Sequence, residues 1–124
     1  MSERYCPQTD ISEWGTAVGI TRDELPSQVA KKTEEDLEVL SAWVEGDEEE
    51  LAKELVDSII VAIGMLGLLG VDFYQAVQDK MTVTWEKYDP DKVEAYMALG
   101  MTRDEAFSQL KQEWAVLHPP AMVE

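Results

Sequence analysis

The feature that most constrains the fold is the junction Gly46-Asp47, where a residue that ends helices is followed directly by one that begins them. Glycine readily adopts the left-handed conformation at which helices end, and aspartate is a preferred N-cap. The run before the junction has a helical apolar period, and the run after it opens with Glu48–Glu50, which the positive end of a helix dipole favours. We therefore expect two helices that fold back on each other across a tight turn.

Each of these two helices carries a pair of carboxylates three residues apart. Glu35 and Glu38 lie on the first helix, and Glu54 and Asp57 lie on the second. Residues at this spacing share one helix face, so antiparallel helices can bring all four together. Hard cations such as Mg²⁺ prefer oxygen ligands. The second pair lies on a face that turns apolar just beyond Ser58, where a bound cation would compensate for buried charge.

A solvated acidic surface is the alternative explanation of this pattern. The chain has 10 basic and 26 acidic residues, for a formal charge of −16, and 11 of the acids fall within residues 34–57. Charged runs usually lie in solvent. The same charge repels nucleic acid and anionic membranes, so neither is an expected partner.

The rest of the chain also shows helical periods, and no segment alternates at period 2 for long enough to predict a strand. The expected helix starts are Asp10 or Ser12, the capping-box patterns Thr21–Glu24 and Thr102–Glu105, and Asp72, with a break at Asp89-Pro90-Asp91. With 124 residues, 45% of them hydrophobic, the chain suits one domain. We predict an all-α helical bundle of four to six helices.

The most apolar run, from Ser58 to Val71, is shorter than the roughly 20 residues that a membrane span needs. It is apolar on every side, which is typical of a helix buried all round. Gly64 and Gly67 would let another helix approach closely. We expect a subunit interface there and a homo-oligomer. Cys6 is the only cysteine and no signal peptide is apparent, so we expect a reducing, cytoplasmic location.

The order of these parts resembles the all-α nucleotide pyrophosphohydrolases, the superfamily of the MazG-like proteins, the all-α dUTPases and the phosphoribosyl-ATP pyrophosphohydrolases. The pattern Glu34-Glu35-x-x-Glu38, followed by Glu54-x-x-Asp57, is similar to their ExxE…ExxD motif. Three further segments agree with it and extend the resemblance over about residues 11–88. They are Trp14 in an I-x-x-W setting, Gln28 with Lys31/Lys32, and Lys80-x-x-x-Thr84-x-x-Lys87-Tyr88, in which Thr84 replaces the usual Asn.

The resemblance implies Mg²⁺-dependent hydrolysis of a nucleoside triphosphate to the monophosphate and pyrophosphate, with Mn²⁺ as an alternative ion. The residues Glu35, Glu38, Glu54 and Asp57 would hold the metal and carry the catalysis. Substrate contacts would come from Lys31, Lys80, Lys87, Tyr88 and Trp14. The resemblance also implies a homodimer or homotetramer. Residues 92–124 lie outside the resemblance, and we expect them to form a helical extension.

Other interpretations stay open for several of these residues. Lys87 and Tyr88 are also suited to finishing a helix, where a cation is favoured. Trp14 suits core or interface packing as well as stacking on a base. For the whole chain, the alternatives are an acidic helical interaction module without activity, and a member that binds nucleotide without turnover.

Overall fold

The computed structural model describes residues 4–120, and in that part every regular element is helical, as predicted. The chain divides into two compact units, residues 1–74 and 75–124, and each is described by itself. A single domain over 1–124 stays a prediction, since the division falls between Tyr74 and Gln75. Within residues 4–120, no single helix is long and apolar enough to cross a membrane. One pair of helical segments separated by a bend, α3 (Glu48–Leu68) and Phe73–Ala98, reaches the required length and composition when the two are taken together.

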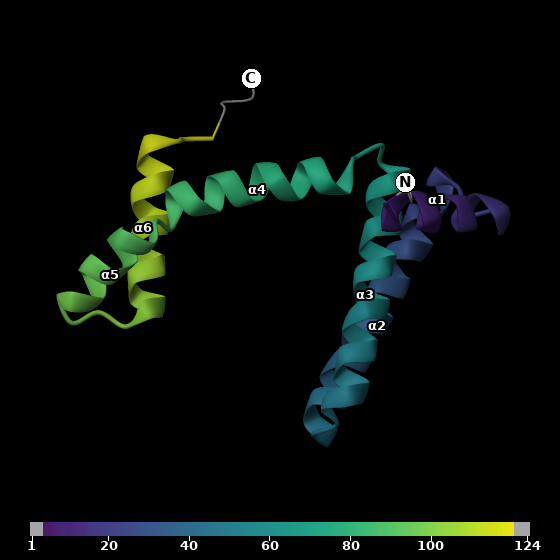
Figure 1. The fold of residues 1–124 in the computed structure, drawn as a ribbon, viewed down its shortest axis with the longest axis horizontal. Helices are drawn as coiled ribbons and strands as arrows, with labels where there is room; N and C mark the ends of the chain where they lie inside the picture. The colour runs from purple at the N-terminus through teal and green to yellow at the C-terminus, as the bar shows by residue number, and fades with distance from the viewer. Residues whose placement is uncertain (1–3, 121–124) are drawn as a thin grey trace. The chain divides into compact units, whose positions relative to one another are not determined.

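The first unit is built on the hairpin of α2 (Leu25–Glu45) and α3 (Glu48–Leu68), which lie side by side (Figure 1). Gly46 adopts a φ of 74°, in the left-handed region that only glycine enters without strain. The Asp47 side chain then accepts a hydrogen bond from the backbone N–H of Glu50 at 3.0 Å, which caps α3. The predicted turn is therefore confirmed at both residues.

Helix α1 (Pro7–Ala17) packs on α3 near its C-terminal end (Figure 1). A Cβ added at Gly64 would lie 3.3 Å from Ile11 Cγ2, and one at Gly67 would lie 2.9 Å from Ser12 Oγ. The two glycines therefore do permit close helix approach, and the helix that approaches is α1 of the same chain. The Gln8 carboxamide also joins α1 to the segment that follows α3. It donates to the Val71 carbonyl at 2.9 Å and accepts from the Phe73 N–H at 2.8 Å.

Two predicted helix starts in this unit are wrong. Helix α1 begins at Pro7 rather than after Asp10 or Ser12, because the fixed φ of proline suits the first helical position. The Thr21 side chain makes no cap hydrogen bond: Arg22–Glu24 is a short 3-10 helix (η1), and α2 begins only at Leu25. Pro26 explains the shift, since an α-helix starting at Thr21 would place its ring against the Arg22 carbonyl.

The second unit contains most of α4 (Phe73–Lys87), then α5 (Pro90–Ala98) and α6 (Arg103–Leu117). Asp89 caps α5, and Thr102 and Glu105 form the predicted capping box on α6. Ala106 and Leu110 are buried, and α5 and α6 pack together. The Tyr96 hydroxyl donates to Glu113 Oε1 at 2.5 Å between these two helices.

Many large apolar side chains of the first unit are exposed. On α2 the apolar period seen in the sequence faces outward, with Leu37 60%, Leu40 57% and Val44 76% exposed, while Glu35 and Ala42 face inward. On α3, Ile59 is 50% exposed. The apolar helix is thus only partly covered by its own chain, and its use as a subunit interface stays a prediction.

Candidate functional site

Three of the four predicted carboxylates meet between α2 and α3. Glu35, Glu38 and Glu54 each offer one carboxylate oxygen, and these oxygens lie within 4.8 Å of one another. The i, i+3 spacing places Glu35 and Glu38 on one face of α2, and the hairpin brings Glu54 of α3 opposite them. Among the described residues, this carboxylate cluster is the group whose geometry suits a metal ion.

Two oxygens of the carboxylate cluster are buried without a hydrogen-bond partner. Glu35 is only 6% exposed, and its Oε2 has no donor, although its Oε1 lies 3.0 Å from the Lys31 ammonium. Glu54 Oε2 is likewise buried and has no hydrogen-bond partner. A buried carboxylate oxygen without a partner carries a desolvation cost of several kcal/mol or shifts its pKa. A hard divalent cation would satisfy both oxygens, so the donor set fits such an ion.

The pKa of Glu54 is raised by the carboxyl groups that surround it. The close approach of the Glu50 carboxyl, then that of Glu38, and then burial raise the pKa of Glu54 to about 7. A carboxyl-to-carboxyl approach becomes a hydrogen bond only when one of the two groups holds a proton. When all are ionised, Glu54 Oε2 has no donor, which agrees with its unpartnered state. In the absence of a cation, the carboxylate cluster therefore repels itself near neutral pH.

Asp57 is exposed and is not one of the three converging residues. The next residue of α3, Ser58, is buried, and its hydroxyl donates across the helix pair to Asp36 Oδ1 at 2.7 Å. The same Asp36 oxygen accepts from Lys32 Nζ at 2.7 Å. The Lys32 ammonium, then the Ser58 hydroxyl, lowers the pKa of Asp36. Asp36 is thus satisfied within the fold. The metal role of Asp57 stays a prediction.

Of the predicted substrate contacts, Lys31 lies at the carboxylate cluster, with its ammonium paired to Glu35 and, at 3.8 Å, to Glu34. This pairing raises the pKa of Lys31, mainly through the hydrogen bond to Glu35. Lys87 and Tyr88 belong to the second unit, as does Lys80. There the Lys87 ammonium lies 5.2 Å from the centre of the Tyr88 ring, in the range of a cation–π contact. A substrate role for these three residues stays a prediction.

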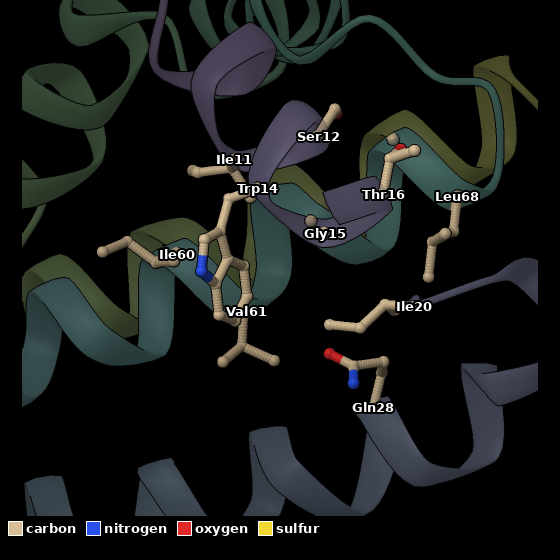
Figure 2. A pocket seen from close by; sticks show the side chains of 12 residues that line it. Ile11, Ser12, Trp14, Gly15, Thr16, Ile20, Gln28, Ile60, Val61 and Leu68 are labelled. Atoms are coloured by element: carbon tan, nitrogen blue, oxygen red, sulfur yellow. The ribbon is translucent and has the colours of Figure 1, made fainter. Parts of the chain in front are cut away.

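Trp14 lines a cavity of about 180 Å³ between α1, α3 and the start of α2 (Figure 2). Its lining is mainly apolar and includes Ile20, Val61 and Leu68. Figure 2 shows the Gln28 side chain reaching from α2 toward Ile20 at one side of this cavity. None of the clustered carboxylates lines the cavity.

The cavity and the carboxylate cluster nevertheless lie along one face of the hairpin. Val61 follows Glu54 by seven residues on α3, and Gln28 precedes Glu35 by seven residues on α2. Seven residues are about two turns, or about 10 Å, and return to the same helix face. Because α2 and α3 are antiparallel, both steps run in the same direction. The cavity therefore begins about two turns from the carboxylate cluster.

Sequence reasoning missed Glu50 and the cavity. Glu50 lies four residues before Glu54 on the same helix face, so its influence on Glu54 was readable from the i, i+4 spacing. The cavity depends on how closely α1 settles on α3, for which Gly64 and Gly67 were the available signal.

These features define an all-α protein whose central helix pair gathers carboxylates beside an apolar cavity. The family model of phosphoribosyl-ATP pyrophosphohydrolase matches residues 18–81, which is more than half of the chain, and the chain belongs to this family. It is therefore a member of the all-α nucleotide pyrophosphohydrolase superfamily, whose enzymes generally use a divalent metal. The matched segment contains α2, α3 and the carboxylate cluster. Comparison with curated proteins and with solved structures gave no match.

Proposed function

We propose that this protein hydrolyses a nucleoside triphosphate to the nucleoside monophosphate and pyrophosphate, with Mg²⁺ held by Glu35, Glu38 and Glu54. The observation that carries the proposal is the pair of buried, unpartnered oxygens of Glu35 and Glu54 in the carboxylate cluster. Family membership supports pyrophosphohydrolase chemistry on a nucleotide. Asp57, one turn beyond Glu54, is the fourth candidate ligand from the sequence motif.

The reaction joins a water oxygen to the α-phosphorus and breaks the bond from that phosphorus to the bridging oxygen, which leaves with pyrophosphate. A bound Mg²⁺ would neutralise phosphate charge and make water more acidic. The chain's own carboxylates would orient the water and accept its proton. Lys31 is placed to offset the negative charge of the carboxylate cluster, through its ion pair with Glu35. Without such compensation, a chain of net charge −16 would repel a triphosphate.

The matched family's name points to phosphoribosyl-ATP as a second substrate to compare. Both substrates contain the same α–β phosphoric anhydride, so the carboxylate cluster serves either reaction. We favour the simple triphosphate, because the mainly apolar lining of the cavity two turns from the carboxylate cluster suits a base and offers no cationic side chain for an additional ribose phosphate. A panel of the common dNTPs and NTPs with phosphoribosyl-ATP, assayed for pyrophosphate, separates the two.

The test of the function is pyrophosphate release with Mg²⁺, with EDTA, and in the variants Glu35→Gln and Glu54→Gln. We expect EDTA and each variant to abolish release while the helical circular dichroism persists. Glu45→Gln is the matched control, since Glu45 is exposed at the end of α2. Release by Glu35→Gln at the rate of Glu45→Gln would contradict the proposal. Tight nucleotide binding without release would instead identify a binding protein that no longer turns over.

A further inference from the structure

The hydrogen bond between Ser58 and Asp36 joins α3 to α2 beside the carboxylate cluster. Ser58 is buried, and its hydroxyl donates to Asp36 Oδ1 at 2.7 Å. The Lys32 ammonium donates to the same oxygen from one turn earlier on α2. Within the described residues 4–120, no other side-chain hydrogen bond or ion pair connects α2 to α3, apart from the carboxyl groups that gather at Glu54.

Apolar packing alone does little to fix how α2 is rotated about its axis. The buried residues of the two helices are Glu35, Ala42, Ser58 and Ile63. Two of these four are polar, and hydrophobic contacts have no preferred direction. A buried hydroxyl, in contrast, costs stability unless it meets a partner, so it favours the one alignment that supplies an acceptor. A single buried polar residue fixes the register of coiled coils in the same way.

Asp36 and Glu38 lie on opposite sides of Glu35 around α2. Each residue advances about 100° around a helix, so Asp36 lies about 100° to one side of Glu35 and Glu38 about 60° to the other. Asp36 accepts from Ser58 on one side, and Glu38 approaches Glu54 on the other. Ser58 and Glu54 are one turn apart on the same face of α3. A rotation of α2 that broke the Ser58 bond would therefore also move Glu35 and Glu38 relative to Glu54.

We infer that Asp36 and Ser58 are positioning residues, whose hydrogen bond sets the alignment of α2 and α3 at which the carboxylate cluster can share one cation. Asp36 does not bind the ion in this account, because its Oδ1 already accepts from both Ser58 and Lys32. The inference rests on the proposed function for its cation site. Contacts that orient metal ligands from outside typically change metal affinity by about 10- to 100-fold.

The test is Mn²⁺ binding to the full chain without nucleotide, followed by the electron paramagnetic resonance signal of the free ion. Ser58→Ala should weaken binding about tenfold, because the alignment is lost while every carboxylate stays. Asp36→Ala should weaken it at least as much, and it keeps the test open if Ser58→Ala fails to fold, since Asp36 is exposed. The double variant should bind as weakly as Asp36→Ala and no more weakly, because both changes remove the same bond. Wild-type affinity in a folded Ser58→Ala, or losses that add in the double variant, would overturn the inference.

Two control variants separate positioning from charge and from stability. Asp36→Asn removes the same charge as Asp36→Ala but keeps an oxygen that can accept from Ser58, so it should bind Mn²⁺ within about threefold of the wild type. Equal losses in Asp36→Asn and Asp36→Ala would overturn the inference, because the charge alone would explain both. Ile63→Val removes a buried methyl group from the same helix pair and leaves the bond in place. It should lower the melting temperature and keep wild-type Mn²⁺ affinity; a loss of affinity equal to that of Ser58→Ala would overturn the inference.

Pyrophosphate release by the same proteins separates this inference from the proposed function. Mn²⁺ binding and release that are both unchanged in Ser58→Ala would overturn the inference and leave the function standing. Mn²⁺ binding that Ser58→Ala weakens and Asp36→Asn preserves, with no release from any triphosphate, would support the inference and reject the function. A wild-type chain that binds no Mn²⁺ would reject both.

Discussion

Glutamates play opposite parts in the two helix pairs of this molecule. In the α5–α6 pair, Glu105 accepts a hydrogen bond from the Thr102 N–H at 3.0 Å, and this bond lowers the pKa of Glu105. In the α2–α3 pair, Glu54 meets other carboxyls instead of donors, and its pKa rises to about 7. A carboxylate with a donor stabilises the fold, whereas crowded carboxylates cost stability unless something else binds them. This difference supports the proposal that the α2–α3 pair binds a cation.

The largest effect we expect is on turnover, and it should be confined to one helix pair. Glu54→Gln should lower kcat/KM for the best triphosphate by about a thousandfold or more, because several kcal/mol of charge stabilisation would be lost with the metal. Glu105→Gln should leave kcat/KM within about twofold, since its carboxylate serves only a helix cap. Steady-state pyrophosphate release checks both. Similar losses in the two variants would break the comparison.

The next effect concerns the exposed apolar period of α2. Leu37, Leu40 and Val44 are each more than half exposed, and a patch of this kind marks an interaction site. We expect the wild-type chain to be a homodimer or larger in sedimentation velocity. Leu40→Glu should shift it toward monomer, whereas Val116→Glu, at an exposed position on α6, should not. A wild-type chain that sediments as a monomer would refute the oligomer prediction.

A smaller effect is expected from the helix cap of the second unit. Thr102→Ala removes the hydroxyl that accepts from the Glu105 N–H at 3.1 Å. The loss should lower the free energy of unfolding by about 1 kcal/mol, the usual contribution of an N-cap. Thr21→Ala should have almost no effect, because Thr21 makes no such bond. Urea unfolding of the two variants provides the measurement, and equal losses would contradict the structure.

A further effect, which falls on the fold rather than on turnover, is the pH dependence of metal-free stability. Glu54 binds its proton more tightly in the folded state, with a pKa near 7 against 4.5 for an unperturbed glutamate. Between these two values the folded state holds more protons than the unfolded state, so stability falls as pH rises. Glu54→Gln should remove this slope, and Mg²⁺ should flatten it. The measurement is thermal unfolding of the wild type and of Glu54→Gln from pH 4.5 to 7.5 in EDTA. A wild-type stability that rises with pH relative to that of Glu54→Gln would contradict the prediction.

The sequence predicts a helix boundary well where the residues that end or cap the helix are present and no nearby residue interrupts the helix. Gly46-Asp47 and the Thr102–Glu105 box both appear as predicted. The segment GITRDE at residues 19–24 is nearly identical to GMTRDE at residues 100–105, but it does not begin an α-helix. Pro26 follows it closely, and an α-helix from Thr21 could not continue through that proline. Similar cap motifs thus lead to different starts according to what comes two residues later.

The candidate site is predictable only in part, for a related reason. The i, i+3 spacing correctly indicates which carboxylates share a face of each helix. Which ones meet across the pair depends on how each helix is rotated about its axis. That rotation brings Glu54 to Glu35 and leaves Asp57 exposed, and it follows from packing around Ala42, Ser58 and Ile63 that no local pattern specifies.

The central claim is that Glu35, Glu38 and Glu54 hold a divalent cation. The most direct measurement is anomalous diffraction from crystals grown with Mn²⁺ in place of Mg²⁺. We predict an anomalous peak within coordination distance of all three carboxylates in the wild-type protein, and its loss in Glu35→Gln. Crystals that show these carboxylates turned into solvent with no peak between them, or a peak that persists unchanged in Glu35→Gln, would contradict the account.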